Sequence, residues 1–501
     1  SMYLMSEEKS NRQPQNRYFI GAESPWLKIG YGDSYPMYPS LIMSGKRIRG
    51  LTSSLLLGFF NIDFAYGETI RKIQSNVTII ESTQMGLDSS KTYFQPDSNT
   101  YAIMNRRGEF TRNLLFIRPS FGSGESYQLG FSYLKSKDDK NSIKYGLGPK
   151  ENLVLGSDLL LAFDQRRIEL TAQAGFSVTN NDISKGNIKD EEIDSLFKDN
   201  SDQVRKIRDI FSKSMTVNEN VVPLNLKGLT TLSYEGALNL NYFDNLFRFS
   251  YLRRGKGYES FGQSYLRTNV SGFNVTDRFR MLNNKLFLSL GFEKLSDNVG
   301  DLESFTTKFT TISTTAAYYP QQDLPNVSLG YVYASASNNL PQDSSSAFDD
   351  YTNRIFLQTG YNFVYLEKQN VVFGISTSNR NDRTVKDWDT KNFSLSLGLN
   401  TYFSFPLQTS LNLSFNNSST RGTKWNYTNL ALTGYYKLLD DRLYLNAGMR
   451  STFGDVKRSV FDLGAQYTII RNLSVLGQVS LYSFKSANSE SVWSLMLRYD
   501  I

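Results

Sequence analysis

Apolar and polar residues alternate with a period of two over long stretches of this chain. In the final segment Trp493, Leu495 and Leu497 fall on one side, and Ser494 and Arg498 fall on the other. Such alternation predicts β-strands with one apolar and one polar face. The segments keep this period over roughly 9 to 13 residues, the length a tilted strand needs to cross a bilayer. Strands of soluble sheets average only about 5 to 6 residues, so the pattern favours strands that span a membrane.

The connections show a second regularity, in which short turns alternate with long polar loops. Short periplasmic turns and longer extracellular loops are typical of outer-membrane barrels. We therefore predict an all-β fold, an antiparallel up-and-down transmembrane barrel of about 22 strands (range about 20 to 24), with both termini on the periplasmic side. The short turns are expected at 58–59, 122–123, 165–166, 244–245, 283–284, 369–370, 440–441 and 471–472, and loops are expected at 137–151, 338–350, 379–390 and 416–424.

The predicted organisation is a polar tail over residues 1–17, followed by a single barrel over residues 18–501. Long insertions are expected at 73–111 and 179–227. Apolar residues recur every three or four positions near 190–213, which predicts an amphipathic helix. This helix is expected to be a lid or plug of the lumen, with a docking site for a partner lipoprotein and a solvated ornament as alternatives. Its apolar residues are Ile193, Leu196, Phe197, Val204, Ile207, Ile210 and Phe211.

Composition narrows the choice of class. Mean hydropathy is −0.40 although 14% of the residues are aromatic, and no apolar run reaches the ~18 residues of a transmembrane helix. A barrel fits, because only every second side chain of its strands meets lipid. The first 17 residues contain no secretory signal, so we expect that a signal, and an upstream domain with it, has been removed.

Cysteine and histidine are both absent, which excludes thiolate and imidazole metal sites and every histidine-based catalytic set. No acidic pair stands out for a carboxylate mechanism. We therefore expect no enzymatic activity, no catalytic or metal-binding residues and no cofactor. The net charge of +7 is scattered along the chain, so nucleic acid is not an expected partner.

Charged residues and tyrosines in the polar phase of the strands are candidates for lining the lumen. The charges are expected either to select solutes or simply to pair with one another in a wet interior. The tyrosines are expected either to form a track for sugars or peptides or to belong to an interfacial girdle. The candidates are Arg118, Asp158, Glu169, Glu235, Arg248, Arg278, Arg280, Glu293, Tyr402, Tyr435, Tyr444, Arg450, Asp462 and Arg498.

These features resemble the large outer-membrane barrels of Bacteroidota and Chlorobi-type bacteria, which have Tyr-, Asn- and Ser-rich lumen faces and a final strand like residues 497–501. The stretches 32–36 and 45–50 also resemble segments of uncharacterised proteins in that group. A strand number near 22 resembles, in addition, the barrel of TonB-dependent transporters, whose lumen is closed by a separate N-terminal plug. No segment of that size precedes Tyr18 in this sequence.

The favoured function is an integral outer-membrane pore or translocation channel for a solute or a polypeptide, with its lumen occluded by loops or by a partner. One alternative is a non-conducting docking barrel that anchors surface or periplasmic proteins. Another is the barrel of a TonB-dependent transporter that lacks its plug. The expected partners are outer-membrane lipid and a periplasmic protein or lipoprotein.

Overall fold

Antiparallel strands make up most of this computed structural model, which describes residues 2–3, 11–81, 93–97, 100–197, 201–222, 229–320, 324–484 and 489–499. Consecutive long strands pair with one another, as the two-residue period predicts. The strands are β1 (Met2–Tyr3), β2 (Arg17–Glu23), β3 (Leu27–Ser34), β4 (Ile48–Leu56), β5 (Phe60–Ile70), β6 (Asn76–Glu81), β7 (Tyr93–Asp97), β8 (Thr100–Arg106), β9 (Thr111–Phe121), β10 (Tyr127–Asp139), β11 (Glu151–Phe163), β12 (Ile168–Asn180), β13 (Val221–Val222), β14 (Leu232–Tyr242), β15 (Asn245–Arg254), β16 (Val270–Met281), β17 (Leu286–Ser296), β18 (Lys308–Tyr318), β19 (Asn326–Ser337), β20 (Asp349–Tyr365), β21 (Glu367–Asp382), β22 (Thr390–Tyr402), β23 (Leu407–Thr420), β24 (Thr423–Leu438), β25 (Leu443–Gly454), β26 (Arg458–Ile470), β27 (Leu473–Phe484) and β28 (Glu490–Tyr499).

The main sheet has 25 strands among the described residues. Two of these, β1 and β13, have only two residues each, which leaves 23 longer strands and agrees with the expected range. In unit 1, β2 starts at the edge that carries the long loops. In unit 2, β28 ends at the edge that carries the short turns.

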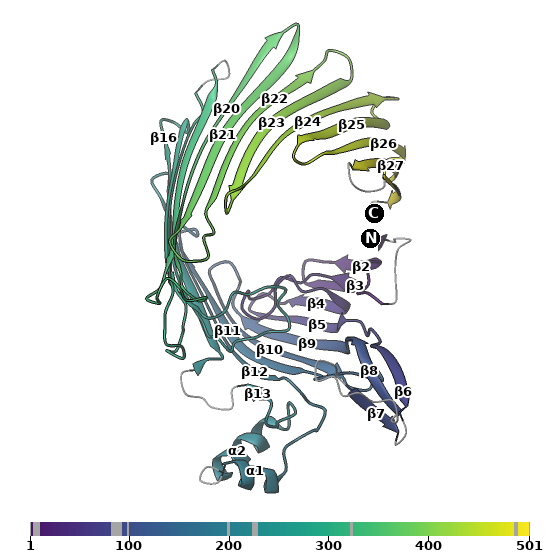
Figure 1. Ribbon diagram of the computed structural model, residues 1–501, viewed down its shortest axis with the longest axis vertical. Helices are drawn as coiled ribbons and strands as arrows, with labels where there is room; N and C mark the ends of the chain where they lie inside the picture. The colour runs from purple at the N-terminus through teal and green to yellow at the C-terminus, as the bar shows by residue number, and fades with distance from the viewer. Residues whose placement is uncertain are drawn as a thin grey trace. The chain divides into compact units, whose positions relative to one another are not determined.

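The chain divides into two compact units. Unit 1 comprises residues 1–239, 250–272 and 297–304, and unit 2 comprises residues 240–249, 273–296 and 305–501. In unit 1 the strands β2 to β5 and β9 to β12 pair in sequence. In unit 2 the strands β17 to β28 pair in sequence, and Figure 1 shows β20 to β27 running side by side.

Most of the expected turns and loops are confirmed, and two are wrong. A predicted turn at 369–370 lies inside β21, because the chain already reverses at Leu366 with a positive φ of 60°. The predicted loop at 416–424 is paired strand on both sides of a two-residue turn at Arg421 and Gly422. The polar residues of this segment indicate a loop, but their side chains form hydrogen bonds across the sheet, as the Ser418 hydroxyl does to Asn392.

The insertion expected at 73–111 contains its own three-stranded sheet, in the order β6-β8-β7. The second insertion, between β12 and β14, contains the helices α1 (Asp190–Phe197) and α2 (Ser201–Phe211), which confirms a helical segment near 190–213. In Figure 1 both helices lie beyond the end of the sheet near β12 and β13. Neither helix, nor any other in the described part of the chain, is long and apolar enough to cross a membrane.

Each long strand presents a polar face and an apolar face, and the apolar faces line up across neighbouring strands. In unit 2 Leu397 of β22 lies opposite Phe373 of β21 and Leu413 of β23. These positions are open: Phe393 is 44% and Leu397 is 48% exposed. A continuous exposed apolar surface of this kind is costly in water but is required against lipid.

Replacing Leu397 by arginine is expected to lower the free energy of unfolding from lipid vesicles by about 2 to 4 kcal/mol, because the charge would face the middle of the bilayer. The matched control is Ser396→Arg on the polar face of the same strand, which should change stability by less than about 0.5 kcal/mol. Urea unfolding from vesicles measures both. Equal losses for the two variants would contradict the assignment of the faces.

Candidate functional site

The polar face of unit 1 carries a buried three-residue ion network. Arg118 of β9 donates to Asp158 of β11 at 2.9 Å and 2.5 Å, and to Asp63 of β5 at 2.8 Å. The Arg118 side chain is only 9% exposed. One guanidinium thus pairs with two carboxylates, and buried charges require such partners.

A glycine makes the Arg118 to Asp158 pair possible. These two residues belong to β9 and β11, and β10 lies between those strands. At the crossing point β10 has Gly130, and a Cβ there would lie 2.6 Å from Asp158 Oδ1 and 2.7 Å from Arg118 Nε. Any larger residue would therefore separate the pair.

Two loops cover the polar face of unit 1, and we call residues 35–47 and 255–269 the covering loops. The first loop places Leu41, Ile42 and Met43 against the sheet, and all three are completely buried. A cluster of apolar side chains in the polar phase of the strands receives them, formed by Ala65, Leu114, Phe116, Leu134 and Val154 together with Ile48 and Tyr258. The first covering loop is thus packed as a core segment.

Hydrogen bonds join the two covering loops to each other. The Tyr258 hydroxyl donates to the carbonyl of Leu41 at 2.8 Å, and the Ser260 hydroxyl donates to the carbonyl of Ile42 at 2.5 Å. The backbone N–H of Ser44 donates to the carbonyl of Gly262 at 3.1 Å. These bonds satisfy backbone groups that would otherwise be buried without partners.

Two glycines of the sheet provide the space into which the covering loops fit. A Cβ on Gly156 of β11 would lie 2.2 Å from Ile42 Cδ1, and a Cβ on Gly175 of β12 would lie 2.5 Å from the Tyr258 hydroxyl oxygen. Side chains of the strands also hold the second loop, since the N–H of Phe261 donates to Asn152 at 3.1 Å. Sheet and loops are therefore complementary in shape and in hydrogen bonding.

A second charged group anchors the first covering loop. Glu235 of β14 accepts from Arg254 at 2.6 Å, from Gln173 at 2.5 Å and from the Ser40 hydroxyl at 2.8 Å. Gln173 in turn accepts from the N–H of Leu41 at 3.1 Å. The Glu235 group thus links the covering loop to three strands, β12, β14 and β15.

Burial also changes the acidity of groups in the covering loops. It raises the pKa of Tyr38 to about 12, with a further contribution from the nearby Asp63 carboxylate. It raises the pKa of Tyr258 as well, again with a carboxylate, Glu235, as the next cause. Burial, followed by repulsion from Arg112, lowers the pKa of Lys46. Both tyrosines therefore remain neutral at physiological pH, and Tyr258 keeps the proton that it donates to the carbonyl of Leu41.

The helical insertion lies on the other face of the sheet from the covering loops. Phe211 and Met215 pack with Leu153 and Val178, which are in the apolar phase of β11 and β12. This placement differs from the expected lid or plug of the polar face, because the apolar residues of the insertion find their partners on the apolar face. Ile193 is buried and Ile210 is 68% exposed, whereas the side chains of Leu196, Phe197, Val204 and Ile207 lie outside the described residues.

Unit 2 has a polar face of a different chemical character, built from hydrogen-bonded amides and hydroxyls. Asn400 donates to Asn370 at 3.1 Å, and Asn370 donates to Asn362 at 2.7 Å, so that one row crosses β22, β21 and β20. A second row includes Thr452, which donates to Asn429 at 2.9 Å. These groups offer neutral donors and acceptors along the sheet.

The candidates for lining the lumen all fall in the polar phase of their strands. Arg118 and Asp158 pair as described, and Arg450 donates to Asp462 at 2.7 Å. This pairing corresponds to the second expectation, in which the charges pair with one another in a wet interior. The remaining candidates on this phase are Glu169, Glu235, Arg248, Arg278, Arg280, Glu293, Tyr402, Tyr435, Tyr444 and Arg498.

Among the tyrosines, Tyr402 and Tyr435 both lie opposite Gln408 of β23, and Tyr444 lies opposite Lys437. Their side chains are 39 to 47% exposed. The three residues are thus near the short-turn edge, where either a track or a girdle remains a prediction.

Sequence reasoning missed the covering loops as a site. The stretches 32–36 and 45–50 drew attention only by resemblance, and residues 255–269 drew none. The signal was the run Leu41, Ile42 and Met43 inside a connection, because three consecutive apolar residues in a loop indicate burial against something else.

A sheet with a continuous exposed apolar face and a polar face that carries paired charges has the two-faced pattern typical of outer-membrane β-barrel proteins. No protein-family model and no curated protein matches the sequence. Among solved structures the chain is similar to the copper transporter OprC, with 8% identity over 96% of this chain and 70% of that chain and a TM-score of 0.41.

Two further structures are similar to the chain at the level of backbone arrangement. The ferric-catecholate import receptor Fiu from E. coli K12 has 9% identity, covers 98% of this chain and 76% of its own, and gives a TM-score of 0.36. The alcaligin outer-membrane receptor FauA from Bordetella pertussis has 11% identity, and the match covers 90% of this chain and 81% of that chain with a TM-score of 0.31.

Replacing Gly130 by alanine is expected to destabilise the protein by about 2 to 3 kcal/mol, because the new methyl group would force Arg118 away from Asp158 and leave a buried charge with fewer partners. Urea unfolding in detergent or lipid measures the loss. The matched control is Gly434→Ala, where nothing lies within 4 Å of the new Cβ. The idea fails if both variants have the same stability.

Replacing Tyr258 by phenylalanine is expected to leave the carbonyl of Leu41 without its donor, at a cost of about 1 to 3 kcal/mol. The loss should be local, so hydrogen exchange of the backbone amides in residues 38–45 should become faster while strand amides stay protected. Tyr265→Phe is the control, since Tyr265 is 82% exposed. Unchanged exchange in Tyr258→Phe would show that this bond does not hold the loop.

Proposed function

We propose that this protein is an outer-membrane transport pore whose polar face lines the lumen and whose covering loops restrict passage. The observation that carries this proposal is the burial of Leu41, Ile42 and Met43 on the polar face of unit 1. On this polar face, an apolar cluster and two glycines form a surface that fits a loop. We infer that the function of this surface is to hold the first covering loop over the sheet. The covering loops are in our proposal the element that occludes the lumen.

The polar face of unit 2 suggests the kind of cargo. Its rows of Asn, Ser and Thr supply neutral hydrogen-bonding groups, and the charges near them are paired, as Arg450 and Asp462 are. Such a surface favours hydrophilic solutes or an unfolded polypeptide over strong selection by charge. We further propose that the protein acts without catalytic chemistry, in lipid and with a periplasmic or lipoprotein partner, and that it belongs with the Bacteroidota-type barrels it resembles.

Single-channel recording in planar bilayers tests the pore. A Cβ on Gly45 would lie 3.7 Å from Ser264 Cβ, within the usual range for a disulfide, and the chain has no other cysteine. In the variant Gly45→Cys/Ser264→Cys the two covering loops are linked when oxidised, and we expect fewer or smaller openings than in the reduced protein. Replacing residues 38–45 by a Gly-Ser linker should instead raise conductance severalfold.

The single variants Gly45→Cys and Ser264→Cys are the controls, because they cannot form an internal disulfide and should not respond to oxidation. If the natural protein and both loop variants are correctly folded yet silent, the pore proposal is wrong.

A second candidate function is a docking barrel that anchors other proteins. It is favoured by the helical insertion, which packs at the loop edge of the apolar face and leaves Ile210 68% exposed. Silent bilayers would support this candidate. The third candidate, the barrel of a TonB-dependent transporter, requires a plug of roughly 100 to 150 residues upstream, which sequencing of the upstream codons would reveal.

A further inference from the structure

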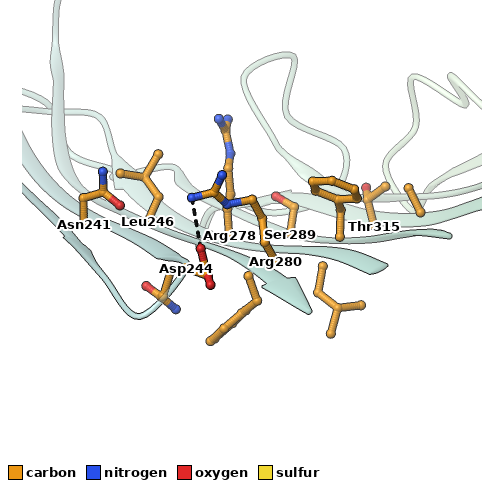
Figure 2. A pocket seen from close by; sticks show the side chains of 12 residues that line it. Asn241, Asp244, Leu246, Arg278, Arg280, Ser289 and Thr315 are labelled. Carbon is orange, nitrogen blue, oxygen red and sulfur yellow. Dashed lines mark ion pairs between the residues drawn. The ribbon is translucent and has the colours of Figure 1, made fainter. Parts of the chain in front are cut away.

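A hollow of about 320 Å³ opens on the polar face of unit 2, next to the short-turn edge. Its walls come from five consecutive strands, β14 to β18, and from the turn at Asp244. Figure 2 shows Arg278 and Arg280 rising from the same strand into this space, with Asn241, Ser289 and Thr315 around them. A volume of this size is at the lower end of the range for small-molecule sites, about 300 to 1,000 Å³.

The hollow has an excess of positive charge. Arg280 has one acidic neighbour, Asp244, at 3.4 Å, and both side chains are at least half exposed. Arg278 has no hydrogen-bond or ion-pair partner among the described residues. This contrasts with Arg118 and Arg450 on the polar faces, whose guanidinium groups are paired. An arginine left unpaired in a hollow is prepared for an anionic group that it can bind through two parallel hydrogen bonds.

The rest of the lining limits what that anion can be. Asn241, Ser289 and Thr315 add neutral hydrogen-bonding groups, whereas Leu246, Phe287 and Ala317 form an apolar wall. A bare inorganic ion would leave this wall in contact with water. A carboxylate attached to an apolar body would satisfy the arginines and cover the wall together.

We propose that this hollow is a binding site for small organic acids, with Arg278 as the main carboxylate ligand and Arg280 as the second. Asp244 competes for Arg280 and so lowers affinity. The site deepens the proposed function, because it would give a pore of weak charge selectivity a preference for one class of solute. Binding does not depend on conduction, so the two proposals can fail separately.

The test is calorimetric titration of the folded protein in detergent with three probes: benzoate, its uncharged analogue benzamide, and inorganic phosphate. We expect saturable binding of benzoate that weakens as salt is raised. Benzamide and phosphate should each bind at least tenfold more weakly, because one lacks the charge and the other lacks the apolar body.

Variants then locate the site. Arg278→Gln should weaken benzoate binding at least tenfold, and Asp244→Asn should strengthen it severalfold by releasing Arg280. Arg354→Gln is the matched control, since Arg354 is an exposed arginine on the same polar face but outside the hollow. Urea midpoints equal to that of the natural protein confirm that each variant is folded.

The proposal is overturned if benzamide or phosphate binds as tightly as benzoate, or if folded Arg278→Gln binds benzoate like the natural protein. An equal loss of affinity in Arg278→Gln and Arg354→Gln would also overturn it, because that result indicates attraction by the whole polar face.

Discussion

The backbone hydrogen bond inside a bilayer is the constraint on which this structure depends. Lipid offers no partner to an N–H or C=O group, so every strand in it must be paired along its length. Pairing places alternate side chains on opposite faces. Leu397, Phe373 and Leu413 therefore form a row on the apolar face that lipid would contact. The other face carries polar groups, and those that are buried, as Arg118 is, need partners within the protein.

The polar side chains of the two units find their partners in different ways. In unit 1 the buried Arg118 pairs with Asp63 and Asp158, and two loops cover the sheet. Gly130, Gly156 and Gly175 allow the close approaches that both devices need. Unit 2 uses neutral rows of amides and hydroxyls. We infer that the first arrangement controls access and that the second provides a surface along which hydrophilic cargo moves.

We propose functions for two features outside the regular strand pairing, the covering loops and the hollow around Arg278. Covering loops are stable because they bury apolar residues and exchange hydrogen bonds with one another, as Tyr258 does with Leu41. Their removal would therefore cost stability in unit 1 while leaving strand pairing intact. In unit 2, Arg278 is exposed, has no hydrogen-bond or ion-pair partner among the described residues, and lines the hollow for which we propose a ligand.

The sequence by itself determined the strands, their two faces and most of the turns, since a period of two is a local property and each strand repeats it. It also placed every candidate for lining the lumen on the polar phase. Only the tertiary structure decided that Arg118 meets Asp158 across Gly130, that residues 35–47 and 255–269 meet over the sheet, and that Phe211 packs on the apolar face. These contacts join residues up to 223 positions apart, as the bond from Gln263 to the carbonyl of Ser40 does. Local periodicity carries no information about which distant segments share a surface, because packing and hydrogen-bond geometry select among many compatible pairings.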